Sequence, residues 1–233
     1  MSGIVEVSDL HIRYGSYEAV KGVSFSLGKG EVLGIVGESG SGKSTIAKAI
    51  MGLQKPSSGK IEIAPDTGIQ MIFQDAVGSL NPRMTVRQTL EEVLKVKRKE
   101  RSAESLLSLV GLSKAVLEQY PREMSGGQCQ RVSIARALAC EPRVLVADEP
   151  VSALDVSVQA RVLNLLRDLC RDLGLSIILI AHDLAVVKNV CDRICVMERG
   201  RFVDEGKPES VFSSPSSEYT RRLLAAVPRI KQH

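Results

Sequence analysis

The residues with the clearest chemical potential form a glycine-rich run, Gly37-Glu38-Ser39-Gly40-Ser41-Gly42-Lys43-Ser44. It matches the pattern G-x-x-x-x-G-K-S and follows an apolar stretch, residues 31–36, that is predicted to be a strand. Glycines let the backbone curl so that successive N–H groups point at phosphate oxygens, and a following helix adds partial positive charge. Lys43 would reach the β- and γ-phosphates, and the Ser44 hydroxyl would bind Mg²⁺. The run predicts a nucleotide phosphate site, against the alternative of a Gly/Ser-rich turn before a helix.

Two adjacent carboxylates, Asp148 and Glu149, follow the apolar stretch 144–147, which is predicted to be a buried strand. Ligands in open α/β sheets bind at the C-terminal ends of the strands. We expect Asp148 to hold Mg²⁺ through water and Glu149 to polarise the attacking water as a general base. Such a pair is also common as a cap or a surface feature, but its place after a phosphate-binding loop favours the catalytic interpretation.

The elements that must position these groups alternate between strands and helices. Residues 75–139 are mostly helical in pattern, and Ser125-Gly126-Gly127-Gln128 has the spacing of a capping box. Ser213–Ser217 is predicted to be a solvated linker. We expect an α/β fold with a mostly parallel sheet covered on both faces and a helical insertion. Strands are predicted at 3–13, 18–27, 31–36, 60–74 (two, around a turn at 64–68), 144–147, 176–180 and 193–205 (a hairpin), and helices at 44–51 and 156–173.

The segment Met124-Ser125-Gly126-Gly127-Gln128-Cys129-Gln130-Arg131 resembles the signature motif of ABC-type ATPases, which usually begins with Leu where this chain has Met124. Other segments in the family's order support the resemblance. Tyr14 resembles the aromatic residue that stacks on adenine, and Gln74 resembles the loop glutamine that reaches Mg²⁺. Ser152-Ala153-Leu154-Asp155 resembles the loop that crosses the dimer interface, and His182 resembles the switch histidine that contacts the γ-phosphate.

The resemblance implies a set of site residues for ATP and Mg²⁺. The implied catalytic residues are Lys43, Glu149 and His182, and the implied metal ligands are Ser44, Gln74 and Asp148. The implied nucleotide-binding residues are Tyr14, Gly37, Glu38, Ser39, Gly40, Ser41, Gly42, Lys43, Ser44, Thr45, Gln74, Ser125, Gly127, Gln128 and Asp155.

The resemblance also implies an architecture and partners. The ABC ATPase fold has a P-loop core, an N-terminal antiparallel β part and an inserted helical subdomain. We expect one domain over residues 1–233, with a core lobe at 1–74 and 141–233 and a helical lobe at 75–140. The implied partners are a second cassette, identical or different, two membrane permease subunits and, indirectly, an extracytoplasmic substrate-binding protein. The expected location is cytoplasmic, peripheral on the inner face of the cell membrane.

Two further segments resemble the peptide and nickel importer branch of this family, namely Ser79–Val86 and Tyr219–Pro228. The branch usually has His-Pro where this chain has Ser217-Glu218, and its peptide members often continue into a cysteine-bearing extension. The implied function is ATP hydrolysis that powers an importer of peptides or of nickel and metal-chelate complexes. The alternatives are a soluble ABC-type ATPase acting on nucleic acid or the ribosome, and a non-catalytic regulatory cassette.

Composition narrows the function classes further. The 31 basic and 27 acidic residues leave a net charge of +4, and aromatic residues make up 3% of the chain, so no nucleic-acid partner is expected. The basic run Lys95–Arg101 is predicted to be a solvated face rather than a nucleic-acid or lipid patch. The chain shows neither a secretory signal nor a membrane-spanning stretch, which favours a soluble intracellular protein. The five dispersed cysteines are expected to be reduced and mostly buried.

Overall fold

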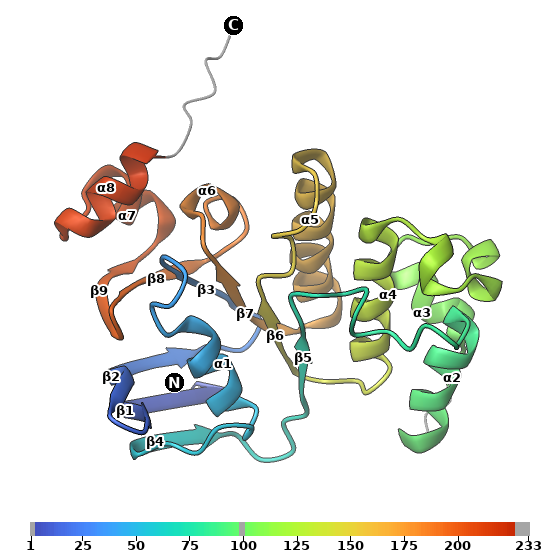
Figure 1. Cartoon of the computed structure of the whole chain (residues 1–233), viewed down its shortest axis with the longest axis horizontal. Coiled ribbons are helices and arrows are strands. Elements are labelled where there is room, and N and C mark those ends of the chain that lie inside the picture. The colour runs from blue at the N-terminus through green and yellow to red at the C-terminus, as the bar shows by residue number, and fades with distance from the viewer. Residues whose placement is uncertain (1–2, 98–100, 227–233) are drawn as a thin grey trace, which may run out of the picture. The chain divides into compact units, whose positions relative to one another are not determined.

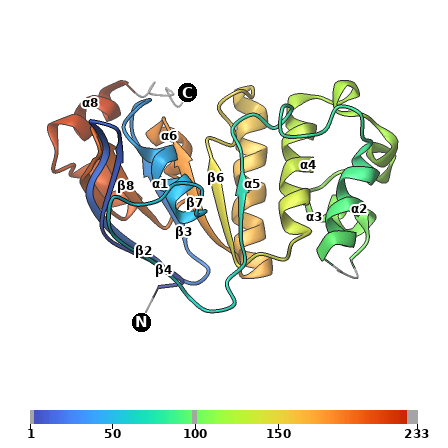
Figure 2. The same cartoon turned by 60° about the horizontal axis from the view of Figure 1, so that its bottom comes forward.

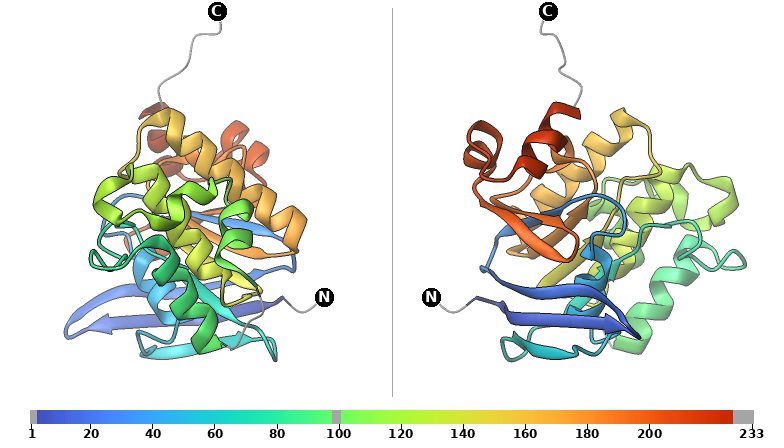
Figure 3. Two further views of the ribbon diagram at one scale, coloured as in Figure 1. Left: turned by 90° about the vertical axis from the view of Figure 1, so that its right-hand side faces the viewer. Right: turned by 60° about the vertical axis from the view of Figure 1, so that its left-hand side comes forward.

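The first two strands form a hairpin in the computed structural model, which describes residues 3–97 and 101–226 (Figure 1). β1 (Val5–Tyr14) pairs antiparallel with β2 (Tyr17–Leu27), and β4 (Ser58–Ile63) pairs antiparallel with the other edge of β1. The three strands lie side by side in Figure 3. β1 buries Val5, Val7, Leu10 and Ile12, so this sheet has one apolar face. The expected antiparallel β part is therefore present.

A second group of strands carries the phosphate-binding loop. β3 (Val32–Val36) lies between β7 (Ser176–Ala181) and β8 (Arg193–Glu198) and is parallel to both, and β8 pairs antiparallel with β9 (Arg201–Gly206). Every residue of β3 and β7 is buried. Such continuous apolar strands are typical of parallel sheets covered on both faces. The helices of this part of the chain are α1 (Lys43–Ile50), α6 (Leu184–Val187), α7 (Pro208–Ser213) and α8 (Glu218–Ala226).

Contacts divide the chain into two compact units, Met1–Pro65 with Ser176–His233, and Asp66–Leu175. The second unit contains β5 (Ile69–Ile72) and β6 (Val144–Asp148), which pair in parallel. The two strands expected around the turn at 64–68 therefore pair with different partners, since β4 joins β1. The lobe boundaries expected at residues 75 and 140 stay a prediction.

Helices make up the rest of the second unit, as the apolar spacing predicts (Figure 2). α4 packs against α2, α3 and α5 around buried residues that include Leu90, Leu106 and Ile134. α4 is thus the central helix of this unit. The elements are α2 (Val86–Lys97), α3 (Ala103–Leu109), the 3₁₀ turns η1 (Lys114–Glu118) and η2 (Pro121–Glu123), α4 (Gly126–Leu138) and α5 (Val156–Leu173).

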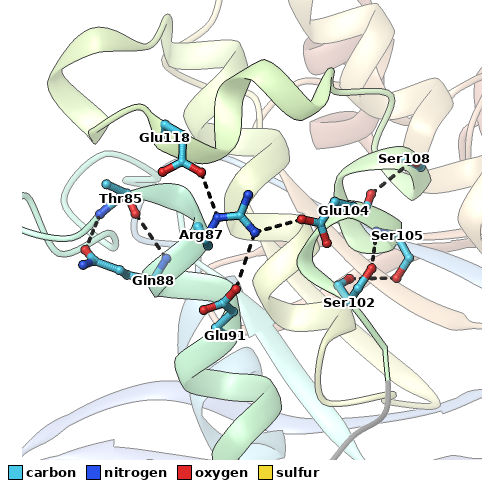
Figure 4. A network of polar contacts seen from close by, with 9 residues as sticks. All are labelled: Thr85, Arg87, Gln88, Glu91, Ser102, Glu104, Ser105, Ser108 and Glu118. Carbon is cyan, nitrogen blue, oxygen red and sulfur yellow. Dashed lines mark hydrogen bonds and ion pairs between the residues drawn. The ribbon is translucent and has the colours of Figure 1, made fainter.

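One arginine joins three of these elements through carboxylates (Figure 4). The guanidinium of Arg87 on α2 lies 2.8 Å from Glu118 of η1, 2.8 Å from Glu104 of α3 and 3.5 Å from Glu91. Hydrogen bonds to Glu104 and Glu118 raise the pKa of Arg87, and the bond from Arg87 lowers the pKa of Glu104. Because these groups face water, the network orients α2, α3 and η1 more than it stabilises them.

The basic run after α2 is only partly described. Lys95 and Lys97 belong to α2, Arg101 lies 3.4 Å from Glu141, and residues 98–100 lie outside the described residues. The solvated face expected here stays a prediction. In the described ranges, 3–97 and 101–226, no helix has the length and apolarity that crossing a membrane requires.

All five cysteines are free thiols, and Cys129, Cys170, Cys191 and Cys195 are buried, as expected. Burial raises the pKa of the Cys191 and Cys195 thiols, so both stay protonated at neutral pH. These side chains are packing residues of the core.

Candidate active site

The glycine-rich run is the turn between β3 and α1, as its sequence predicts. Gly40 and Gly42 have φ values of 80° and 113°, in the left-handed region that favours glycine. A Cβ at Gly37 would lie 2.1 Å from the carbonyl oxygen of Met197, and a Cβ at Gly42 would lie 2.5 Å from that of Ala19. The loop therefore runs directly against the backbones of β8 and β2, and side chains at these two positions would displace it.

Lys43 begins α1 and folds back over this loop. It is 3% exposed, and its Nζ donates to the carbonyl oxygens of Gly37 at 2.8 Å and Glu38 at 2.9 Å. Two carbonyl oxygens partly offset the cost of burying an ammonium group. The positive charge is thus held against the first two residues of the loop.

The hydroxyl of Ser41 offers a test of whether the loop fits a nucleotide. The Ser41 Oγ is buried and finds no hydrogen-bond partner among the described residues. Buried polar groups in folded proteins are nearly always paired. An anionic phosphate oxygen would accept from this hydroxyl and would lie close to the charge of Lys43. The loop, the hydroxyl and the ammonium group therefore fit phosphates.

A hollow of about 540 Å³ adjoins the loop. Tyr14, predicted to stack on adenine, lies at the end of β1 with 45% of its surface exposed, whereas its cross-strand partner Tyr17 lines the hollow. Tyr17 is thus an aromatic residue beside the loop that the sequence reasoning missed, although its spacing from Tyr14 across a turn could have indicated it. The hollow is lined by Tyr17, Lys21, Glu38, Ser39, Gly40, Ser41, Glu198, Arg199, Tyr219, Arg222, Leu223 and Ala226.

The acidic pair lies at the end of β6. Asp148 is the last residue of that strand and is 9% exposed. Glu149 follows with φ 47°, a left-handed conformation that costs energy for a residue other than glycine. Strained backbone of this kind concentrates at functional sites because the surrounding structure must hold it in place.

The predicted loop glutamine contacts this acidic pair within the second unit. Gln74 Nε2 donates to Glu149 Oε2 at 3.4 Å and to Ser152 Oγ at 3.3 Å, and Ser152 Oγ donates to the carbonyl oxygen of Glu149 at 3.2 Å. The structure therefore brings Gln74 and Glu149 together, although they are 75 positions apart. Ser152 forms hydrogen bonds with both of these residues.

The signature segment begins α4 with the predicted capping box. Ser125 Oγ accepts from the Gln128 N–H at 3.3 Å, and Gln128 Oε1 accepts from the Ser125 N–H at 2.9 Å. A Cβ at Gly127 would lie 2.5 Å from Val158 Cγ1, and one at Gly126 would lie 3.3 Å from Leu154 Cδ2. Gly127 thus permits close packing of α4 on α5, and Gly126 lies against the segment that precedes α5.

Gly127→Ala and Gly126→Ala form a matched pair that measures this packing. Both changes gain the helix propensity of alanine, but only the methyl group added in Gly127→Ala would meet Val158 at a forbidden distance. We expect Gly127→Ala to be less stable than Gly126→Ala by about 1–2 kcal/mol. Urea unfolding of the two variants measures this difference, and equal stabilities would show that α5 does not restrict position 127.

The remaining predicted residues lie at the ends of elements. His182 follows β7 directly and is exposed, and the next residue, Asp183, caps α6 by accepting from the Ala185 N–H at 2.8 Å. Asp155 is the exposed N-cap residue of α5. The unit of residues 1–65 and 176–233 therefore holds Tyr14, the loop, Ser44, Thr45 and His182. The unit of residues 66–175 holds Gln74, Ser125–Gln128, Asp148, Glu149 and Asp155.

Comparison with known proteins agrees with this fold. Residues 20–152 match the family described as ABC transporter, which is more than half of the chain. The chain belongs to the ABC transporter family, as one of its ATP-binding cassettes, and it is an ABC ATPase.

Its relatives include peptide transport proteins. The chain is 45% identical over 259 residues to the oligopeptide transport ATP-binding protein OppF of Escherichia coli, an alignment that covers 97% of this chain and 78% of that one. OppF of Lactococcus lactis strain IL1403 is 43% identical, and the alignment covers 99% of this chain and 82% of that protein. OppD of Mycobacterium bovis is 48% identical over 92% of this chain, which spans 38% of that protein.

Solved structures confirm the predicted ABC ATPase fold. The cassette MJ0796, dimeric and bound to ADP and Pi in a post-hydrolysis state, has a TM-score of 0.75 at 29% identity and covers 88% of this chain and 98% of its own. cbiO1 from Clostridium perfringens, part of the ABC transporter complex cbiONQ, has a TM-score of 0.80 at 29% identity, with coverages of 99% and 98%.

Proposed function

We propose that this chain is the ATP-hydrolysing subunit of an ABC importer whose cargo is oligopeptides. The observation that carries the proposal is the similarity to OppF of Escherichia coli, which covers 97% of this chain at 45% identity. The fold alone does not select a cargo, because one architecture serves many functions. The peptide assignment therefore rests on the relatives, and the ATPase assignment rests on both relatives and geometry.

In this proposal the first unit binds the phosphates of ATP. The loop N–H groups, the hydroxyl of Ser41 and the ammonium group of Lys43 contact phosphate oxygens, and Tyr14 stacks on the adenine. The hydroxyl of Ser44, the amide oxygen of Gln74 and the carboxylate of Asp148 would hold Mg²⁺, and all three are the oxygen ligands that this ion prefers. When bound, Mg²⁺ neutralises charge on the phosphate oxygens.

The proposed general base is Glu149. Its carboxylate accepts a proton from water while the water oxygen forms a bond to the γ-phosphorus and the bond to the bridging oxygen breaks, releasing ADP and phosphate. The amide of Gln74 orients the Glu149 carboxylate through the 3.4 Å contact. His182 contacts the γ-phosphate in this proposal.

The complete site requires a second cassette. Ser125, Gly127 and Gln128 present the N-terminus of α4, which has 13 residues, to ATP held by the partner cassette. Asp155 lies in the loop that meets this partner. The dimeric state of the MJ0796 cassette supports the arrangement, for two identical or two different cassettes.

Transport in this proposal takes place through separate membrane proteins. Two permease subunits receive the motion of the cassettes, an extracytoplasmic binding protein delivers the peptide, and the cassette lies on the inner face of the membrane. The assembly of cbiO1 within a transporter complex supports this arrangement. The nickel or metal-chelate cargo stays a prediction without support from the relatives compared, and those relatives do not favour action on nucleic acid or a regulatory role.

Reconstitution tests the cargo. The chain is combined with its permeases and binding protein in proteoliposomes that contain ATP and Mg²⁺, and uptake of a labelled oligopeptide is compared with uptake of ⁶³Ni²⁺, free or chelated. We expect ATP-dependent accumulation of the peptide and none of nickel. Accumulation of nickel alone would overturn the peptide assignment, and ATP hydrolysis without any uptake would overturn the importer assignment.

A further inference from the structure

The last described helix, α8, carries a tyrosine that reaches the phosphate-binding loop. Tyr219 is 6% exposed, and its hydroxyl oxygen accepts a hydrogen bond from the main-chain N–H of Glu38 at 2.9 Å. The two residues are 181 positions apart in sequence. Burial raises the pKa of the Tyr219 hydroxyl, which is therefore un-ionised at neutral pH. A neutral, buried hydroxyl is thus fixed on the second residue of the loop.

A buried carboxylate anchors the start of this helix on β9. Asp204 accepts from the N–H groups of Ser216 and Ser217, at 2.9 Å each. Burial alone would raise the pKa of Asp204, but hydrogen bonds from Thr220, Ser217 and Ser216 outweigh this effect and lower the pKa to about 2. Asp204 is therefore ionised throughout the physiological range. Ser213–Ser217, predicted to be a solvated linker, connects α7 to α8 and is mostly exposed, while the bonds to Asp204 hold its last two residues in place.

The side chains around Tyr219 restrict the direction in which its ring and hydroxyl point. Ser217 Oγ accepts from the Thr220 N–H at 3.0 Å and lies 2.7 Å from Thr220 Oγ1, and Thr220 is fully buried. The Arg222 guanidinium lies 6.0 Å from the centre of the Tyr219 ring and 3.8 Å from Glu198. α8 therefore presents the hydroxyl to the loop from a capped and anchored first turn.

The peptide groups of Glu38 are held from both sides. Tyr219 binds its N–H, while the ammonium group of Lys43 binds its carbonyl oxygen at 2.9 Å. Contact between Lys43 and phosphate oxygens would compete with this carbonyl bond. The bond to Tyr219 does not involve Lys43, and so it remains available to hold the loop when a nucleotide binds.

We propose that Tyr219 is a positioning residue for nucleotide binding, whose hydroxyl fixes the start of the phosphate-binding loop in the conformation that ATP requires. The inference rests on the proposed ATP-hydrolysing function and extends the site to the C-terminal helix. It assigns a role to the segment around Tyr219, which the sequence alone marked only as a feature of a family branch.

The first test needs no nucleotide. Tyr219→Phe removes the hydroxyl that contacts the Glu38 amide and keeps the ring, and Tyr120→Phe makes the same change at a tyrosine that precedes η2 in the second unit. We expect the Glu38 amide to exchange its hydrogen several times faster in the first variant and at the wild-type rate in the second, measured on the full chain by NMR. Unchanged exchange in Tyr219→Phe would overturn the inference.

The second test measures affinity for a non-hydrolysable ATP analogue with Mg²⁺. Loss of one hydrogen bond predicts a rise in Kd of about two- to tenfold for Tyr219→Phe and none for Tyr120→Phe, with KM for ATP rising and kcat unchanged in Tyr219→Phe. A lower Tm at unchanged Kd would indicate a purely structural role and would overturn the inference. Failure of the wild-type chain to bind the analogue would instead refute the proposed function, while the exchange measurement still decides whether Tyr219 holds the loop.

Discussion

Glu149→Gln is expected to lower ATP hydrolysis by about a hundredfold or more while ATP binding persists. The amide of glutamine cannot accept a proton from water, yet it has the shape of the carboxylate and can still contact Gln74. Glutamine also tolerates the left-handed backbone at this position about as well as glutamate, so the Tm should not change. Because ATP would bind without being consumed, we further expect an ATP-dependent dimer that outlasts the dimer of the unsubstituted chain.

Phosphate release measures the first effect, and light scattering during size-exclusion chromatography with ATP or ADP measures the second. Glu62→Gln is the matched control, since Glu62 lies on β4 and pairs only with Lys60, at 2.7 Å, among the described residues. The control should hydrolyse ATP at the normal rate. Turnover of Glu149→Gln within tenfold of normal would refute the assignment of the base.

Lys43→Met is expected to remove both hydrolysis and most nucleotide affinity. A hydrogen bond to a charged group contributes about 1.5–3 kcal/mol, so the loss of one phosphate contact predicts an affinity lower by about ten- to a hundredfold. The nucleotide-free chain should keep its Tm, because an apolar side chain replaces a buried charge whose desolvation is costly. Lys43→Met should therefore lower nucleotide affinity without lowering the thermal stability of the nucleotide-free chain.

Thermal unfolding with and without Mg²⁺ and ATP measures both the Tm of the nucleotide-free chain and the rise in Tm that ATP causes. A bound ligand at free concentration L stabilises the folded chain by RT ln(1 + L/Kd), so at an ATP concentration near the unsubstituted chain's Kd the ATP-dependent rise in Tm should largely disappear in Lys43→Met. Lys48→Met is the matched control, because Lys48 is an exposed residue in the last turn of the same helix, α1. A normal ATP-dependent rise in Lys43→Met would exclude Lys43 as a phosphate ligand.

Features that depend on neighbouring residues could be predicted from the sequence. The turn at Gly37–Gly42 and the capping box at Ser125 and Gln128 depend on local backbone angles and on hydrogen bonds that span three residues. The buried strands β3, β6 and β7 followed from continuous apolar runs. In each case the residue types restrict the backbone directly, with little help from distant parts of the chain.

Side-chain partners from distant parts of the chain could not be predicted in the same way. The sequence pattern identified two strands between residues 60 and 74, but only packing decided that β4 joins β1 while β5 joins β6. Likewise, nothing local to Gly127 reveals Val158, which makes a side chain at position 127 impossible without a shift. The space around a residue depends on which elements pack against it.

The sequence by itself predicted an ATPase, since Lys43, Asp148 and Glu149 follow predictable strands in a pattern that fits phosphate transfer from ATP to water. The tertiary structure alone decided which distant residues contact this site, with Gln74 bound to Glu149 and Tyr219 bound to Glu38. The physical reason is that a loop conformation depends on angles encoded within a few residues. A hydrogen bond across 181 positions exists only once the intervening chain has folded.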